Sequence, residues 1–227
     1  MTGTSAPRHF TADYVERTTL RDGTPVVLRL LAPEDKALIA EGFRRWSPES
    51  RYARFLAPKT TLTDDELRYL TEIDQETHFA LGALREGGDD DGNPVGLGIA
   101  RFIRLPHLHA TAEAAIAVSD EAQGRGLGKL LFMRLCAAAA ERGIERFRCE
   151  VLGSNTGMTS LIQRITPERE VEVGGGVMTI DLVLPNVTPT APPSTPAPPG
   201  GMYALLRAAA QNAVEWTDAV RRMWRRD

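Results

Sequence analysis

The 227-residue chain has few cysteines, no long apolar run and no excess of positive charge. Its two cysteines, Cys136 and Cys149, form no Cys-x-x-Cys pair, so the sequence predicts neither a disulfide framework nor a metal site. No stretch approaches the ~18 apolar residues of a membrane-spanning helix. The N-terminus lacks the basic and then apolar layout of a secretory signal, and a net charge of −3 does not suggest nucleic acid. These absences favour a cytoplasmic protein without a membrane or nucleic-acid partner.

Composition divides the chain into four parts. Residues 1–18 show no clear periodicity and predict a flexible leader, and residues 19–184 predict one ordered domain. Residues 185–200 contain seven prolines, which cannot join a strand ladder and predict a semi-rigid linker. Residues 201–227 predict an amphipathic helix, because apolar side chains recur every three or four positions over 202–223. We expect this stripe to serve docking or self-association.

The ordered domain contains both strand-like and helical patterns of apolar residues. Strand-like runs occur at 26–31, 78–84, 95–105, 112–118, 146–152, 171–173 and 177–184. Helical patterns occur at 33–43, 48–55, 63–73, 128–142 and 155–165. Three successive strands with short turns predict an antiparallel meander, and the later strand–helix–strand succession predicts one parallel pair. The fold class is therefore α/β of the α+β kind, a mixed and mostly antiparallel sheet with flanking helices.

A glycine-rich loop follows the strand that ends at Val118 and leads directly into a helix. Such a loop can direct several backbone N–H groups at a phosphate. It is not the phosphate loop of NTPases, because Gln123 stands where that loop needs a glycine. It is not the dinucleotide loop either, because the third glycine would fall at Lys129 or Leu131.

The loop does fit the pattern Q-x-x-G-x-G at Gln123, Gly126 and Gly128. This pattern resembles the pyrophosphate loop of the GNAT superfamily of acyl-CoA-dependent N-acyltransferases, and the order of the flanking strands and helices matches as well. The resemblance implies a GNAT-like fold, a central parallel strand pair and acetyl-CoA as cofactor. The residues that it implies for cofactor binding are Ile116, Val118, Gln123, Gly124, Arg125, Gly126, Leu127, Gly128, Lys129 and Asn155. Plainer roles stay open: a glycine turn, a solvated helix start at Arg125 and Lys129, and a helix cap at Asn155.

A finer resemblance lies upstream. Several short segments look like the GNAT domains of bacterial protein lysine acetyltransferases: Leu20–Gly23 with Arg29, Pro33–Asp35 and Ser47–Tyr52. In that group a glutamate on the strand before the loop is the general base, and the pattern places it at Glu113. Arg51 and Tyr52 could line the acceptor site, but packing and surface ion pairing are the favoured roles for both.

The chemistry of such a transfer makes specific demands on the chain. An amine of pKa ≈ 10.4 must lose a proton before it attacks, and a carboxylate on an apolar strand has a raised pKa that suits this task. The resemblance implies the backbone N–H of Val118 as the donor to the developing oxyanion. Many members supply a tyrosine acid on the helix after Asn155, but here Ile162 occupies that position. Three other carboxylates compete with Glu113 for the role of base: Asp120, Glu121 and Glu150.

Three functions stay open at this stage. The first is an acetyl-CoA-dependent N-acetyltransferase that acts on a primary amine, either a small molecule or a protein lysine. The second is a non-catalytic acyl-CoA-binding module, which the missing tyrosine keeps open. The third is an assembly piece whose active surface is the 202–223 helix.

Overall fold

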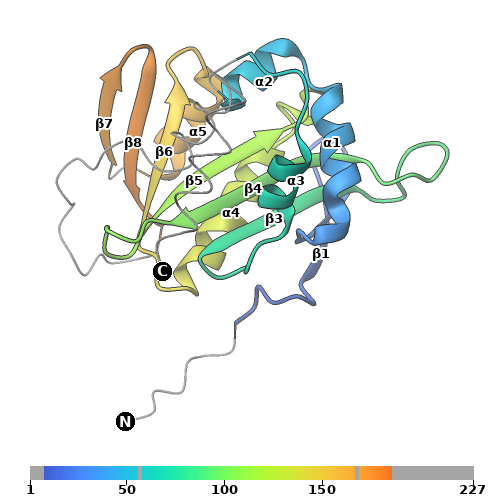
Figure 1. The fold of residues 1–227 in the computed structure, drawn as a ribbon, viewed down its shortest axis with the longest axis horizontal. Helices are drawn as coiled ribbons and strands as arrows, with labels where there is room; N and C mark the ends of the chain where they lie inside the picture. Colours follow the sequence, from blue (N-terminus) through green and yellow to red (C-terminus); the bar gives the residue numbers. More distant parts are fainter. Residues whose placement is uncertain (1–7, 56–57, 167–168, 186–227) are drawn as a thin grey trace, which may run out of the picture.

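The computed structural model describes residues 8–55, 58–166 and 169–185. Its strands form one sheet in the order β1-β2-β3-β4-β5-β6-β8-β7, in which only β5 and β6 run parallel (Figure 1). The strands are β1 (Val15–Thr19), β2 (Pro25–Leu30), β3 (His78–Arg85), β4 (Gly96–Arg104), β5 (Thr111–Val118), β6 (Arg146–Leu152), β7 (Arg169–Gly174) and β8 (Val177–Val183). The helices are α1 (Lys36–Arg45), α2 (Pro48–Phe55), α3 (Asp64–Thr71), α4 (Leu127–Ala140) and α5 (Thr156–Ile165). The predicted fold class, with its meander and its parallel pair, is confirmed.

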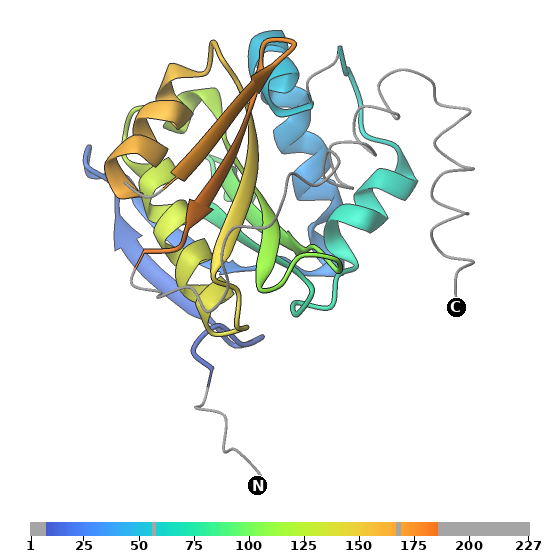
Figure 2. The same ribbon diagram turned by 90° about the vertical axis from the view of Figure 1, so that its left-hand side faces the viewer.

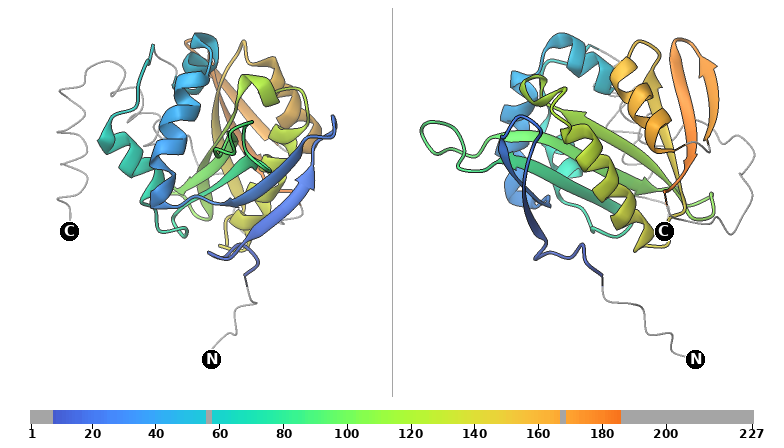
Figure 3. Two further views of the ribbon diagram at one scale, coloured as in Figure 1. Left: turned by 90° about the vertical axis from the view of Figure 1, so that its right-hand side faces the viewer. Right: turned by 180° about the vertical axis from the view of Figure 1, so that it is seen from behind.

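Helices cover the sheet on both faces. Figure 2 shows the sheet between α1 and α3 on one side and α4 and α5 on the other. Seen from behind, α4 crosses the central strands and α5 lies beside β6 (Figure 3). None of the helices in the described ranges is long and apolar enough to cross a membrane.

The main core lies between the sheet and α4. Four phenylalanines without solvent exposure form its centre: Phe79, Phe102, Phe132 and Phe147. The rings of Phe79 and Phe102 stack at 5.2 Å across β3 and β4. A smaller apolar cluster holds α1 and α3 against the opposite face. The apolar cluster on this second face is smaller than the main core, and the same face carries the charged groups described below.

Local sequence signals explain where the helices begin and end. Thr63 caps α3 by accepting from the Glu66 amide, and the Glu66 carboxylate accepts from the Thr63 amide in return. Ser47 accepts from the Ser50 amide at the start of α2. Gly143, at φ +68°, ends the α4 segment as expected. The predicted ends of α3 and α4 are each two residues too long, which is the usual uncertainty of helix termini.

The predicted leader is wrong in its second half. Residues from Val15 already form β1, and the side chains of Phe10 and Tyr14 are buried in the main core. Arg142 fixes this segment by donating to the Phe10 carbonyl at 2.9 Å. The anchor lies 132 residues away in sequence, so no local periodicity could reveal it. The predicted linker beyond residue 185 and the predicted helix at 201–227 lie outside the described residues.

A buried ion pair fixes the start of α1. Two nitrogens of Arg29 donate to Asp35 at 2.5 and 2.7 Å, and the Ala32 amide donates to the same carboxylate at 2.9 Å. Burial alone would raise the pKa of Asp35, but the hydrogen bonds from Arg29 and Ala32 outweigh it and lower that pKa. The ionised form is therefore stabilised by folding.

We expect Asp35→Asn to lower the free energy of unfolding by about 1–3 kcal/mol at neutral pH, because Arg29 loses its charged partner. Since folding depresses the pKa of Asp35, its contribution is present above the unfolded value near 3.9 and is lost as pH falls below it. Urea unfolding at pH 7 and at pH 3 measures both effects. The variant and the natural chain should differ less at pH 3, and an equal difference at both pH values contradicts the assignment.

Candidate active site

The parallel strands β5 and β6 separate at their carboxyl ends. They pair only over Thr111–Glu113 and Arg146–Arg148. Beyond these residues β5 continues against β4 as far as Val118, while β6 continues against β8 as far as Leu152. A gap therefore opens between two central strands, next to the glycine loop that follows β5.

Two backbone N–H groups of β5 face this gap. The Ser119 amide donates to the Leu97 carbonyl at 2.8 Å, so alternate amides of β5 face β4. The amides of Ile116 and Val118 then face the side on which β6 has moved away. The Val118 carbonyl, which also lies outside the ladder, accepts from the Gln123 side chain at 3.3 Å. The gap thus offers hydrogen-bond donors that the sheet does not use.

The glycine loop has the backbone that an anion site needs. Gly124 and Gly126 adopt φ values of +72° and +94°, a region that favours glycine. The first helical bond of α4 runs from the Leu130 amide to the Gly126 carbonyl at 3.1 Å. The amides of Leu127, Gly128 and Lys129 precede that bond, so they point out of the helix start without a helical acceptor.

The turn between β1 and β2 supports the loop from outside. The Arg21 amide donates to the Arg125 carbonyl at 3.3 Å, and Arg125 pairs with Asp22 at 2.8 Å. The Arg21 side chain lies against Gly126, where an added Cβ would be 3.3 Å from Nε. Lys129 is exposed. Arg125 and Lys129 were predicted from the sequence as phosphate contacts, but Arg21 was not. The local signal for it was the Leu20–Gly23 turn.

A polar network joins α2 to the same loop. The Asp120 carboxylate accepts from the Ser47 amide at 2.7 Å, from the Ser50 hydroxyl and from the Gln123 side chain at 3.2 Å. Burial would raise the pKa of Asp120, but the bonds from Ser50 and Ser47 lower it. Asp120 is therefore held as an anion with its lone pairs in use, which argues against it as a base.

We expect Asp120→Ala to weaken cofactor binding several-fold and to cost about 1 kcal/mol of stability, the usual worth of a capping bond. The physical reason is that both α2 and the Gln123 side chain lose their common acceptor. Isothermal titration with coenzyme A and a thermal melt measure the two effects. An unchanged dissociation constant would separate this network from the loop.

The other two competing carboxylates differ in position. Glu121 is exposed and pairs with Arg85 at 2.8 Å, away from the gap. Glu150 lies on β6 opposite Thr179, two residues beyond the last parallel pair. Glu121 therefore suits the role of a control residue, whereas Glu150 stays an alternative base.

Asn155 and Ile162 have structural roles in α5. The Asn155 side chain accepts from the Met158 amide at 3.1 Å and so caps the helix. Ile162 is completely buried in the main core. The helix cap, one of the two open roles of Asn155, is thus present, and the position aligned with a tyrosine acid is part of the main core.

Arg51 and Tyr52 fit the plainer interpretation. Arg51 donates to the Thr60 carbonyl at 3.3 Å, and its guanidinium lies 5.8 Å from the Phe43 ring centroid. Tyr52 is 46% exposed. Packing and loop support account for Arg51, and the acceptor-site role of Tyr52 stays a prediction.

Glu113 is 5% exposed and lies on the same face of β5 as Ala115 and Ala117, which line a cavity beside α1. Its neighbour across β4 is Ile103, and its neighbour on β6 is Arg148, which is engaged by Asp181 at 2.7 and 2.8 Å. Glu113 therefore lies beside the point where the two parallel strands part.

Several polar groups around Glu113 escaped the sequence analysis. Burial raises the pKa of Tyr69, with Arg101 and Arg54 opposing the shift and the Glu113 carboxylate adding to it. Burial lowers the pKa of Arg54, which the same carboxylate partly offsets. These groups come from α2, α3 and β4, so the fold alone brings them together. The one local signal was an arginine, Arg101, in an otherwise apolar stretch of β4.

Residues 41–165 match the acetyltransferase (GNAT) family, which is more than half of the chain. The chain belongs to this family. The matched residues include the gap between β5 and β6, the glycine loop and Glu113. The family match therefore agrees with the resemblance seen in the Q-x-x-G-x-G loop.

Individual GNAT proteins support the same assignment. The chain is 32% identical over 193 residues to the acetyltransferase Pat of Mycolicibacterium smegmatis, covering 85% of this chain and 56% of that protein. It thus spans little more than half the length of that relative. The GNAT domain of S. lividans PAT superposes with a TM-score of 0.66 at 26% identity, over 77% of this chain and 99% of that one. The yncA protein of Salmonella typhimurium, solved with acetyl-CoA, has the same fold at a TM-score of 0.56 and 20% identity, over 75% of this chain and 99% of that one.

Proposed function

We propose that the chain is an acetyl-CoA-dependent N-acetyltransferase that transfers the acetyl group directly to a primary amine. The observation that carries this proposal is the gap between β5 and β6, where the Ile116 and Val118 amides face an opening next to the glycine loop. A gap of this kind can receive an extended amide-containing arm as if it were a missing strand.

The residues present fit acetyl-CoA. The loop amides at Leu127–Lys129 suit a pyrophosphate, and Arg21 and Arg125 bring positive charge beside them. The buried Ser119 hydroxyl, at the carboxyl end of β5, has no hydrogen-bond partner among the described residues, which suits a place that a ligand completes. When bound, acetyl-CoA supplies an acyl group activated as a thioester.

Glu113 is the group that we assign to take the proton of the amine. It lies about 10 Å along β5 from Ile116 and about 17 Å from Val118, at about 3.3 Å per residue. The Ile116 amide is therefore the better placed donor to the thioester oxygen. The Val118 amide, two residues further along, suits the arm of the cofactor. Proton transfer from the amine to Glu113 through water fits these distances.

Turnover with purified protein tests the proposal. Acetyl-CoA and a panel of amines, including a lysine-containing peptide and small amines, should release free thiol above the blank rate. Binding of acetyl-CoA without any thiol release would overturn the enzyme assignment. It would favour instead the acyl-CoA-binding module, which the burial of Ile162 keeps as the second candidate.

A further inference from the structure

A cavity lies between α1, α2 and the sheet face that carries Glu113. Its space, with the opening to solvent included, is about 830 Å³. Much of its wall is apolar: Leu38, Ile39, Phe43, Trp46, Phe55 and Leu62. Small residues provide the room, since Gly82 and Gly96 lie below α1, and an added Cβ on Gly82 would be 3.1 Å from Leu31. Ala115 and Ala117 extend the cavity to β5, beside the gap.

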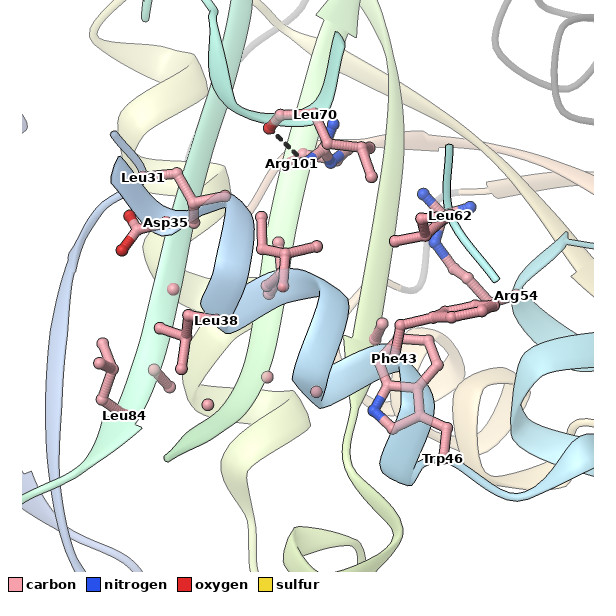
Figure 4. A pocket seen from close by; sticks show the side chains of 18 of the residues that line it. Leu31, Asp35, Leu38, Phe43, Trp46, Arg54, Leu62, Leu70, Leu84 and Arg101 are labelled. Carbon is pink, nitrogen blue, oxygen red and sulfur yellow. Dashed lines mark hydrogen bonds between the residues drawn. The ribbon is translucent and has the colours of Figure 1, made fainter. Parts of the chain in front are cut away.

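Positive charge is concentrated at one end of this cavity. At the other end Arg29 and Asp35 neutralise each other at 2.5 Å. Figure 4 shows Arg54 and Arg101 on the side away from Asp35 and Leu84. Arg54 comes from α2 and Arg101 from β4, and both line the cavity.

Arg101 is a buried cation whose hydrogen bonds within the described residues go to neutral groups. It is 2% exposed, and it donates to the Leu70 carbonyl at 3.0 Å and to the His78 ring at 3.1 Å. Burial, with Arg101 beside it, lowers the pKa of His78 to about 3, so the ring is neutral and can accept. Burial and the neighbouring Arg54 lower the pKa of Arg101 to about 9, which leaves it protonated at neutral pH.

Two guanidinium groups that line the same cavity repel each other, and an anion placed between them would relieve this repulsion. Glu113 offsets part of the burial penalty of Arg54, whereas the hydrogen bonds that Arg101 makes to described residues reach the Leu70 carbonyl and the His78 ring and no carboxylate. A carboxylate is the complementary group, because arginine pairs with it through two parallel hydrogen bonds. The apolar wall suits the body of the same ligand.

We propose that the Arg54–Arg101 end of the cavity binds a carboxylate carried by the acceptor, so that the substrate class is an amine with an apolar body and a carboxylate, as in an apolar amino acid. This inference rests on the proposed function and names its acceptor. The amine then lies toward the gap between β5 and β6, while the carboxylate lies at the Arg54–Arg101 end, where Arg101 is level with Ala115 of β5.

Matched pairs of acceptors test this. Phenylalanine and leucine are compared with phenethylamine and 3-methylbutylamine, which share their bodies and lack the carboxylate. In the natural chain kcat/KM should favour the carboxylated member of each pair. Arg54→Gln should reduce that preference at least tenfold, because the comparison cancels any effect of the change on Glu113. Arg44→Gln is the control, since Arg44 is exposed on α1 and, among the described residues, pairs with Glu41 alone.

Three further measurements test whether the arginine geometry and the acceptor carboxylate are responsible for the preference. Arg54→Lys keeps the charge without the two-pronged geometry and should lose part of the preference, and thermal melts confirm that each variant folds. Succinyl-CoA with phenethylamine asks whether the carboxylate belongs to the acyl donor instead. A loss confined to that arm, or an unchanged preference in Arg54→Gln, overturns the proposal.

A binding measurement separates this inference from the proposed function. Phenylalanine is titrated into the full chain with coenzyme A present, so no transfer occurs. Thermal stabilisation that Arg54→Gln abolishes supports the carboxylate site even if no amine is ever acetylated. If amines were acetylated but the binding of phenylalanine did not depend on Arg54, the enzyme assignment would hold and the proposed acceptor class would be wrong.

Discussion

Glu113→Gln should lower kcat for acetyl transfer at least a hundredfold while the dissociation constant for acetyl-CoA changes by less than about twofold. The substitution keeps the shape of the side chain and removes its ability to accept a proton, and a positioned general base is worth about 10²–10⁴ in rate. Steady-state thiol release and a separate titration with coenzyme A measure the two quantities. The affinity should persist because Glu113 lies on the face opposite the main core and away from the glycine loop.

The pH profile distinguishes a lost base from a damaged site. Without the carboxylate only the free amine can react, so the rate of the variant should rise about tenfold per pH unit up to the pKa of a lysine-like amine near 10.4. The natural chain should show a weaker dependence in the same range. A variant profile that is merely scaled down would assign Glu113 a structural role instead.

Two variants provide the controls for this experiment. Glu113→Asp keeps the charge that Arg54 and Tyr69 sense, but shortens the side chain by one methylene, so it should fold normally and recover only part of the rate. Glu121→Gln changes an exposed carboxylate paired with Arg85 and should leave turnover unaltered. If Glu150→Gln rather than Glu113→Gln abolished turnover, the base would have to be placed on β6.

The loop and the order of elements were predictable because both are encoded over short distances. Q-x-x-G-x-G needs only six residues, and the φ values of Gly124 and Gly126 are the local consequence of glycine at these positions. The same holds for the capping pair of Thr63 and Glu66, three residues apart. The apolar periodicity of a strand or a helix is likewise contained within that one element, so it can be read from a short stretch of sequence.

The polar side of the site was not predictable for the opposite reason. Asp22 meets Arg125 across 103 residues, and Ser47 meets Asp120 across 73. Which face of β4 carries Arg101 depends on its register against β5, and a shift of one residue would reverse it. The sequence around Phe10 shows no helix or strand periodicity. Phe10 is held in place by Arg142, which follows the end of α4.

Gly128→Ala should raise the stability of the chain slightly and at the same time weaken coenzyme A binding at least tenfold. Gly128 lies in the first turn of α4 without positive φ, and an added Cβ would meet Val118 at 3.8 Å and Leu161 at 3.9 Å, both ordinary contacts. The fold therefore accepts the methyl group, and alanine favours a helix over glycine by up to about 1 kcal/mol. We expect the loss of affinity because the methyl group would lie at the start of α4, beside the Leu127–Lys129 amides to which we assign the pyrophosphate.

The opposite signs of the two effects make the experiment decisive. A thermal melt should show an equal or higher midpoint, while isothermal titration shows the weaker dissociation constant, so misfolding cannot explain the result. Gly157→Ala is the matched control, because it also adds a methyl group in the first turn of a helix, with only Asn155 nearby at 3.7 Å. Gly126→Ala is less informative, because φ of +94° strains any other residue and would confound stability with binding. If Gly128→Ala bound coenzyme A as the natural chain does, the pyrophosphate would not lie against the Gly128 amide, and the assignment of the phosphates to the start of α4 would be wrong.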